Sequence, residues 1–142
     1  MGTFMKKRLA VGGENFRDMI RDHCYYVDKT DYIKAVMESG SKVLLITRPR
    51  RFGKTLFMDT LKSFLQLDFL HPGATEGHEH LFSGLRILGE REFCQQFLGQ
   101  YPVIAITLKD VEGASFEEAY ALFAENLTDV ISEYAFLSES PK

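Results

Sequence analysis

The sequence predicts an α/β fold, a three-layer sandwich with a mainly parallel sheet, on the basis of three observations. Two short runs, residues 43–46 and 102–108, are almost entirely apolar, which is typical of central strands that are covered on both faces. The segments that begin at Lys54 and at Ser115 follow these runs and carry apolar residues at helical spacing. The resulting order of strand, helix, strand and helix, with right-handed crossovers, gives such a sandwich.

Length and composition place the chain among single-domain globular proteins. Its 142 residues are 45% hydrophobic and 26% charged, which is normal for a folded domain and argues against disorder. The formal net charge of -3 is unevenly spread, because residues 1–70 hold 13 Lys and Arg against 8 Asp and Glu, and the remainder holds 4 against 12. We therefore expect any anion-binding site in the first half.

The chain carries no signal for a membrane or for an oxidising compartment. No apolar run approaches the roughly 20 residues that a membrane-spanning helix needs, so we expect no membrane partner and a cytoplasmic location. Cys24 and Cys94 lie far apart and have no partner at the spacing of metal ligands. This favours two buried free thiols over a zinc site or a disulfide.

Local signals predict five helices. Asn15 is a suitable N-cap for the first helix, and Gly40 suits the left-handed residue that follows the second. Ser115 and Glu118 have the spacing of a capping box at the start of the last helix. A polar segment with two Gly, residues 74–80, is expected to be a surface loop. The predicted helices cover residues 15–20, a second segment from Asp28 or Thr30 to Gly40, and residues 54–68, 90–98 and 115–134.

The connection between the first predicted strand and its helix resembles a phosphate-binding loop. Residues 47–55 read T-R-P-R-R-F-G-K-T, which departs from the pattern G-x-x-x-x-G-K-[ST] only by having Arg48 in place of the first Gly. Gly53 would permit close approach of a polyphosphate to the backbone, Lys54 would reach the outer phosphates, and the Thr55 hydroxyl would coordinate Mg²⁺. The alternative is a plain helix start whose Arg side chains are solvated.

Arg50 and Arg51 leave three interpretations open. They could form bidentate contacts with phosphate oxygens, contribute a basic patch for nucleic acid, or only increase solubility. No stretch of the chain interleaves basic and aromatic residues as nucleic-acid-binding surfaces do. We therefore do not expect direct nucleic-acid binding by this segment.

A possible metal cluster can be drawn from His71, His78 and His80 with Glu76 and Glu79. Their spacing matches no common ligand set, so a polar loop is the better interpretation.

Two further polar positions are ambiguous. Asp110 follows the second predicted strand, where an acidic residue can contact the Mg²⁺ of a nucleotide, but a turn or capping role before Gly113 is favoured. The segment Val27-Asp28-Lys29-Thr30 has no mechanism that spacing alone provides, and the plainest interpretation is a strand end followed by a helix cap.

Four segments taken together resemble the AAA-ATPase-like family of prokaryotic proteins, from about Val11 to the end of the chain. The pairing of V-D-K-T with R-P-R-R-F-G-K-T is more specific than the loop alone, and that family also carries Arg and Pro where other P-loops begin with Gly. The segments are Tyr25-Tyr26-Val27-Asp28-Lys29-Thr30, residues 44–56, Leu81-Phe82-Ser83-Gly84-Leu85 and Tyr101-Pro102-Val103-Ile104.

The resemblance implies a P-loop NTPase-like sandwich that is truncated here, with ATP and Mg²⁺ as cofactors. Residues 1–41 would be an N-terminal helical extension, and residues 42–142 an incomplete P-loop αβ core. Lys54 would bind phosphate and Thr55 would bind Mg²⁺. The cradle around the phosphates would be formed by Pro49, Arg50, Arg51, Phe52 and Gly53.

Longer members of the family commonly continue into a restriction-endonuclease-like nuclease domain, and they carry a strand that ends in adjacent acidic residues. No apolar strand followed by Asp-Glu is found here, so we expect ATP binding with weak or absent hydrolysis. One alternative is a non-enzymatic interaction module that binds a protein partner or itself through unpaired sheet edges. Another is a nucleic-acid-associated ATPase of a defence or mobile-element system, as the nuclease-bearing relatives suggest.

Overall fold

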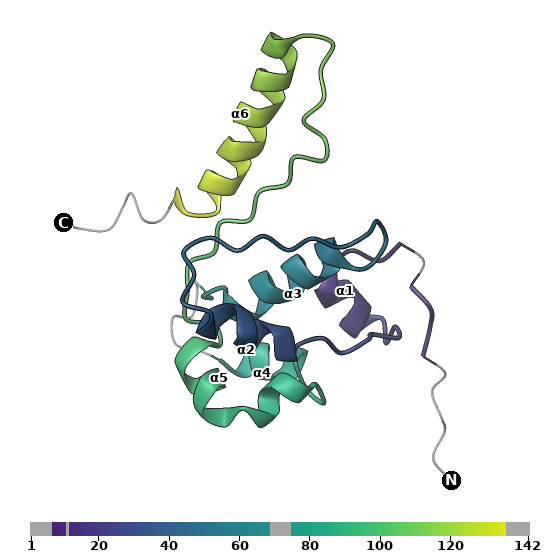
Figure 1. Cartoon of the computed structure of the whole chain (residues 1–142), viewed down its shortest axis with the longest axis vertical. Coiled ribbons are helices and arrows are strands. Elements are labelled where there is room, and N and C mark those ends of the chain that lie inside the picture. The colour runs from purple at the N-terminus through teal and green to yellow at the C-terminus, as the bar shows by residue number, and fades with distance from the viewer. Residues whose placement is uncertain (1–6, 11, 69–74, 136–142) are drawn as a thin grey trace, which may run out of the picture. The chain divides into compact units, whose positions relative to one another are not determined.

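The computed structural model describes residues 7–10, 12–68 and 75–135. Within these ranges the chain forms six α-helices and one 3₁₀ helix (Figure 1). The chain divides into two compact units, Met1–Val103 and Ile104–Lys142.

The first unit contains six of these helices around an apolar core. Helix α1 packs against α3, and η1 packs against both α2 and α5. The centre of the core is aromatic, because the rings of Phe16 and Phe82 lie 4.9 Å apart and those of Phe64 and Phe93 lie 5.9 Å apart. The helices are α1 (Phe16–Arg21), α2 (Asp31–Glu38), α3 (Lys54–Leu65), α4 (Glu76–Leu81), η1 (Arg86–Gly89) and α5 (Arg91–Phe97).

The predicted helices are present because their signals are local. The Asn15 side chain accepts a hydrogen bond of 2.9 Å from the Asp18 N–H and so caps α1, as the sequence predicts. Gly40 has a φ of 65° after α2, a conformation that costs glycine little. Helix α3 ends at Leu65, three residues before the predicted end at residue 68, because the backbone of Gln66 is extended.

The expected three-layer α/β sandwich is wrong: the described residues form helices and no sheet. Residues 43–46 and 102–108 are not strands, and the described residues contain only two isolated parallel bridges, Arg8–Cys24 and Gln66–Tyr101. A β-strand requires neighbouring strands that take up its backbone hydrogen bonds. The described parts of the chain supply no such neighbours, and Val43 and Leu45 are 86% and 85% exposed.

The bridge between Gln66 and Tyr101 joins the end of α3 to the segment that follows α5. The Leu67 N–H donates to the Tyr101 carbonyl at 2.8 Å, and the Tyr101 N–H donates to the Leu65 carbonyl at 2.9 Å. The Gly99 N–H adds a bond of 2.8 Å to the Phe64 carbonyl. The polar groups at the end of α3 are thus satisfied by the segment that follows α5.

The polar segment 74–80 is not the surface loop that composition predicts. Helix α4 (Glu76–Leu81) occupies it, and the Glu79 N–H donates to the Thr75 carbonyl at 2.9 Å. This helix forms because His78 and Leu81 pack toward the core, which outweighs the helix-breaking tendency of Gly77. Ala74 lies outside the described residues.

The second unit consists of an irregular segment and the long helix α6 (Phe116–Ser132). The predicted capping box is present in altered form. The Ser115 hydroxyl accepts the Glu118 N–H at 3.2 Å, while the Glu118 carboxylate accepts the N–H of Ala114 at 2.8 Å rather than that of Ser115. None of the residues of α6 is buried, and several of its apolar side chains are exposed, among them Phe116 at 77% and Tyr120 at 62%.

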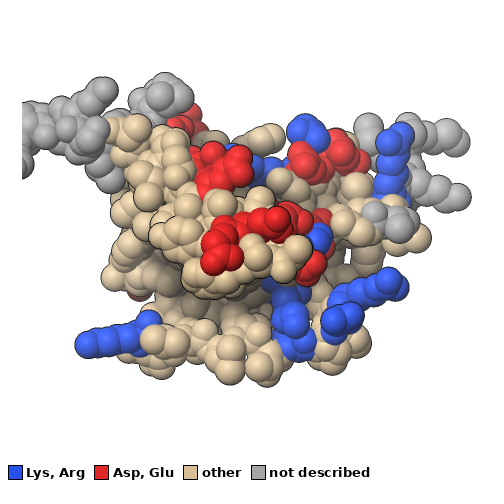
Figure 2. Space-filling model, turned by 90° about the horizontal axis from the view of Figure 1, so that it is seen from above, with Lys and Arg blue, Asp and Glu red and all other residues tan. Residues whose placement is uncertain are grey.

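Charged side chains lie at the surface. Of the described residues, no Lys, Arg, Asp or Glu is buried, and the buried polar residues are Thr30, Thr60, Ser63 and His78. Figure 2 shows acidic and basic side chains at the surface of the molecule. None of the described helices combines the length and the apolar character that crossing a membrane requires.

Candidate phosphate-binding site

The predicted phosphate-binding loop leads directly into α3 by a tight turn. The Phe52 N–H donates to the Pro49 carbonyl at 3.4 Å, and two residues of the turn have left-handed backbones, Arg51 with a φ of 65° and Gly53 with a φ of 75°. A left-handed backbone costs a residue with a Cβ about 1–2 kcal/mol, so the turn holds Arg51 in a strained conformation. Lys54 is the first helical residue.

The start of α3 offers main-chain donors that form no hydrogen bond with the described part of the chain. The N–H of Phe57 donates to the Gly53 carbonyl at 2.9 Å and begins the helical ladder. The preceding N–H groups, those of Gly53, Lys54, Thr55 and Leu56, find no acceptor among the described residues. Such groups carry the partial positive charge of a helix N-terminus and are suited to an anion.

The two side chains with predicted chemical roles lie at this helix start. The Lys54 ammonium folds back over the loop and donates a hydrogen bond of 2.7 Å to the Arg48 carbonyl. The Thr55 side chain is exposed, and its hydroxyl makes no hydrogen bond with the described part of the chain. Both groups are therefore at the protein surface and near the unused N–H donors.

A pocket of about 200 Å³ adjoins the loop. Three cationic side chains line it, those of Lys29, Arg48 and Lys54, and no Asp or Glu does. The Arg48 guanidinium lies 5.4 Å from the centre of the Tyr32 ring, a cation–π distance. The rest of the lining is mostly apolar and consists of Tyr32, Ala35, Val36, Leu44, Ile46, Phe52, Gly53 and Phe57.

The structure separates the seven predicted loop residues into two groups. Phe52, Gly53 and Lys54 line the pocket. The other four are exposed on the turn or at the helix start and do not line it: Pro49, Arg50, Arg51 and Thr55.

Sequence reasoning overlooked Lys29 and Tyr32, which reach the pocket from the start of α2. The V-D-K-T segment was the available signal, since Lys29 lies in it and Tyr32 follows two residues after its end. Spacing could not connect the segment with the loop, because the two are brought together by the packing of α2 and α3 and not by local sequence. The Tyr32 and Phe57 rings meet edge to face, with centroids 6.4 Å apart.

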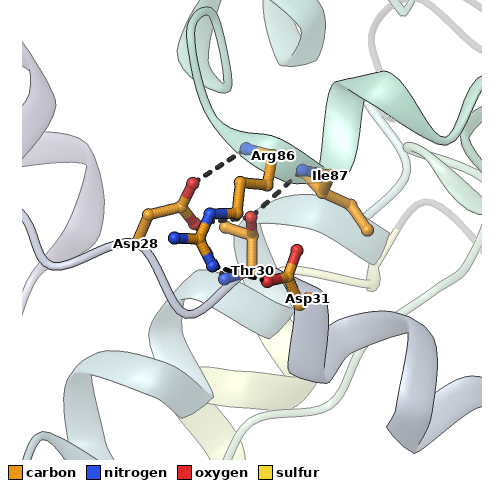
Figure 3. A network of polar contacts seen from close by, with 5 residues as sticks. All are labelled: Asp28, Thr30, Asp31, Arg86 and Ile87. Carbon is orange, nitrogen blue, oxygen red and sulfur yellow. Dashed lines mark hydrogen bonds and ion pairs between the residues drawn. The ribbon is translucent and has the colours of Figure 1, made fainter.

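A polar network holds the V-D-K-T segment against η1 (Figure 3). One oxygen of Asp28 accepts the Thr30 N–H at 2.9 Å and the Thr30 hydroxyl at 2.6 Å, and the other accepts the Arg86 N–H at 2.8 Å. The Thr30 hydroxyl accepts the Ile87 N–H at 3.2 Å, and Asp31 forms an ion pair of 3.0 Å with Arg86. The network fixes the backbone from which Lys29 extends.

The electrostatics of Asp28 follow from this network. Partial burial by itself raises the pKa of the Asp28 carboxyl, but the hydrogen bonds from Thr30 and from the Arg86 N–H, with the nearby Arg86 charge, lower it more. The net pKa is therefore below the ordinary value of an Asp, and the carboxylate is ionised at neutral pH.

The histidine group does not form a metal site in the described residues, where no three His, Cys, Asp or Glu side chains lie close enough to hold an ion. His78 is buried and its Nδ1 lies 3.0 Å from the Ser63 carbonyl, so it is a packing residue. Glu76, Glu79 and His80 are exposed, and His71 lies outside the described residues. Asp110, in the second unit, belongs to a turn in which the Val111 N–H donates to the Leu108 carbonyl at 3.3 Å.

A tight turn that ends in Gly-Lys-Thr at the start of a helix is typical of P-loop proteins. The chain belongs to the AAA-ATPase-like family, described as predicted AAA-ATPase, which it matches over residues 10–141.

Among curated proteins, the chain is similar to the "Uncharacterized protein in vnfD 5'region" of Azotobacter chroococcum mcd 1. The two are 34% identical over 103 residues, which is 72% of this chain. The aligned region is 17% of the length of that relative, so the chain spans only a small part of it. No solved structure matches the chain at a significant level.

Proposed function

We propose that this chain binds ATP, or a related nucleotide, together with Mg²⁺ through the loop of residues 48–55. The strongest support is that the main-chain N–H groups at the start of α3 find no acceptor among the described residues and lie beside a pocket lined by three cations and no carboxylate. A polyphosphate would satisfy these donors and neutralise the cations together. Membership in a family of predicted ATPases adds to this support.

Each loop residue has a role in the proposal. The Lys54 ammonium would leave the Arg48 carbonyl, which it contacts at 2.7 Å, for a phosphate oxygen. The exposed Arg50 and Arg51 would reach phosphate oxygens from the rim of the loop. Gly53 would allow the phosphates to approach the backbone. Phe52 would form part of the pocket wall, and Pro49 would fix the entry of the turn.

The Thr55 hydroxyl fits the role of a Mg²⁺ ligand, because it is exposed and makes no hydrogen bond with the described residues. It supplies one oxygen, and Mg²⁺ prefers six, so the nucleotide phosphates and water would provide the others. Bound Mg²⁺ would neutralise phosphate charge. We therefore propose that this chain holds Mg²⁺ only together with a nucleotide.

Hydrolysis by this chain is proposed to be weak or absent. Phosphoryl transfer needs groups that orient the attacking water and stabilise charge, and the pocket lining contains no Asp, Glu, His or Gln.

Titration calorimetry with ATP and Mg²⁺ tests the proposal. We expect binding by the wild type and a loss of tenfold or more for Lys54→Ala, because a charge-assisted hydrogen bond to phosphate is removed. Thr55→Ala should lose the gain in affinity that Mg²⁺ provides and keep the Mg²⁺-independent part. Lys42→Ala, which removes an exposed Lys outside the pocket, is the matched control. Equal and negligible affinity in wild type, Lys54→Ala and Thr55→Ala would contradict nucleotide binding.

A second candidate function is association with another copy of the chain. The exposed apolar side chains in residues 43–45, in residues 104–108 and in α6 support it, because apolar segments without backbone partners can pair with those of another molecule.

A further inference from the structure

We propose that Lys29 is a second phosphate-binding cation of this site, acting with Lys54 on the polyphosphate of the nucleotide. The inference rests on the proposed function and assigns a chemical role to the V-D-K-T segment. It is supported by the position of the Lys29 ammonium, by its lack of a polar partner among the described residues and by the charge of the pocket.

The position of Lys29 follows from the residues on either side of it. Asp28 and Thr30 are both directed toward η1, where they hold the N–H groups of Arg86 and Ile87 (Figure 3). Lys29 instead lines the pocket beside the loop. Its ammonium nitrogen lies 4.0 Å from the position that a Cβ on Gly53 would occupy. A group that approaches the Gly53 backbone from the pocket would therefore meet this ammonium.

The Lys29 ammonium makes no ion pair or hydrogen bond with the described residues. The comparison with Lys34 is informative, because Lys34 lies in α2 and its ammonium contacts the Glu90 carboxylate at 2.6 Å. The Lys54 ammonium also has an acceptor, the Arg48 carbonyl. The half-buried Lys29 side chain thus lies at the loop without a polar contact to any other described side chain.

The charge of the pocket gives the reason to assign an anion to Lys29. Lys29, Arg48 and Lys54 share one pocket of about 200 Å³ that no carboxylate lines. Like charges gathered in this way repel one another, and the attraction of a multivalent anion to each of them would offset that repulsion. A polyphosphate at the Gly53 backbone would lie within reach of both Lys29 and Lys54.

Titration calorimetry with two probes, ATP with Mg²⁺ and inorganic tripolyphosphate, tests the assignment. We expect Lys29→Gln to weaken both probes by the same factor, about ten- to hundredfold, because the lost contact is to phosphate. Lys29→Arg should retain most of the affinity. Lys42→Gln, which makes the same charge change outside the pocket, should bind as the wild type does. The melting temperature of Lys29→Gln should equal that of the wild type, because the ammonium has no polar partner among the described residues to lose.

Two results would overturn the assignment while leaving nucleotide binding in place. One is that Lys29→Gln binds both probes as tightly as the wild type does, although Lys54→Ala no longer binds them. The other is a loss for ATP without a loss for tripolyphosphate, which would mean that Lys29 acts on the nucleoside. If the wild type binds neither probe, the proposed function itself fails and the role of Lys29 fails with it.

Discussion

At the scale of single residues, the loop depends on backbone conformations that most side chains disfavour. Gly53 is the N-cap residue of α3 and has a φ of 75°. Its contribution to the turn is that, without a Cβ, it adopts this left-handed backbone at little cost. A Cβ there would have ordinary space, because the nearest atom, the Lys29 ammonium, is 4.0 Å away. The cost of a substitution is therefore in the backbone and not in a clash.

We expect Gly53→Ala to lower the free energy of unfolding of the first unit by about 1–2 kcal/mol, because Ala must adopt a left-handed backbone. Urea unfolding followed by circular dichroism measures this change. The matched control is Gly77→Ala in α4, where the backbone is helical and a Cβ meets nothing within 4 Å. That control should be neutral or slightly stabilising. An equal loss in both variants would refute a special role for the backbone at Gly53.

Lys29 illustrates what residue-level pattern reading cannot supply. The residue types and spacing of the Gly-Lys-Thr turn predict its own chemistry, because all its parts are adjacent in the chain. The approach of Lys29 to Gly53 joins residues 24 positions apart and depends on how α2 packs beside α3. No local pattern encodes such a contact.

At the scale of elements, the same distinction separates the helices from the strands. Caps at Asn15 and Ser115 and apolar residues at helical spacing act within one segment, so the helix predictions are largely confirmed. The two apolar runs predict strands only if partners are available, because each strand is completed by the backbone of others. The described residues contain no such partners, and the runs remain irregular.

The polar network between the V-D-K-T segment and η1 gives a prediction for stability. Asp28→Ala removes the acceptor of the Thr30 N–H, the Thr30 hydroxyl and the Arg86 N–H, and we expect a loss of about 1–3 kcal/mol in the free energy of unfolding. Asp22→Ala, which removes an exposed pair with Arg21, should cost less than about 1 kcal/mol.

The dependence on pH has a definite sign. The pKa of Asp28 is lower in the folded than in the unfolded chain, so its stabilisation is present at neutral pH and is lost as pH falls below about 4. The difference in unfolding free energy between wild type and Asp28→Asn should therefore shrink in acid. A difference that stays constant from pH 7 to pH 3 would show that the Asp28 charge does not contribute.

At the scale of the whole molecule, the described chain leaves much of its apolar surface uncovered. The first unit has an aromatic core, but α6 in the second unit has no buried residue, and Val43 and Leu45 are almost fully exposed. Burial of apolar surface is the main favourable term in folding and association, at roughly 25 cal/mol per Å². The uncovered segments therefore favour contact with another apolar surface.

We expect the isolated chain to self-associate as its concentration rises, because contacts between copies would cover these segments. Sedimentation velocity over a hundredfold concentration range measures this directly. Leu45→Lys, on a side chain that is 85% exposed, should shift the equilibrium toward the monomer, whereas Lys42→Gln should not. A monomer at every concentration would argue against the self-association candidate.

The composition of the pocket wall has a practical consequence for spectroscopy. The chain contains six Tyr and no Trp, and Tyr32 stands against the Arg48 guanidinium at the wall of the pocket. An indole introduced by Tyr32→Trp would be the sole such fluorophore in the polypeptide. Because an indole absorbs and emits at longer wavelengths than the remaining Tyr side chains, its emission would signal arrival of a ligand at this position.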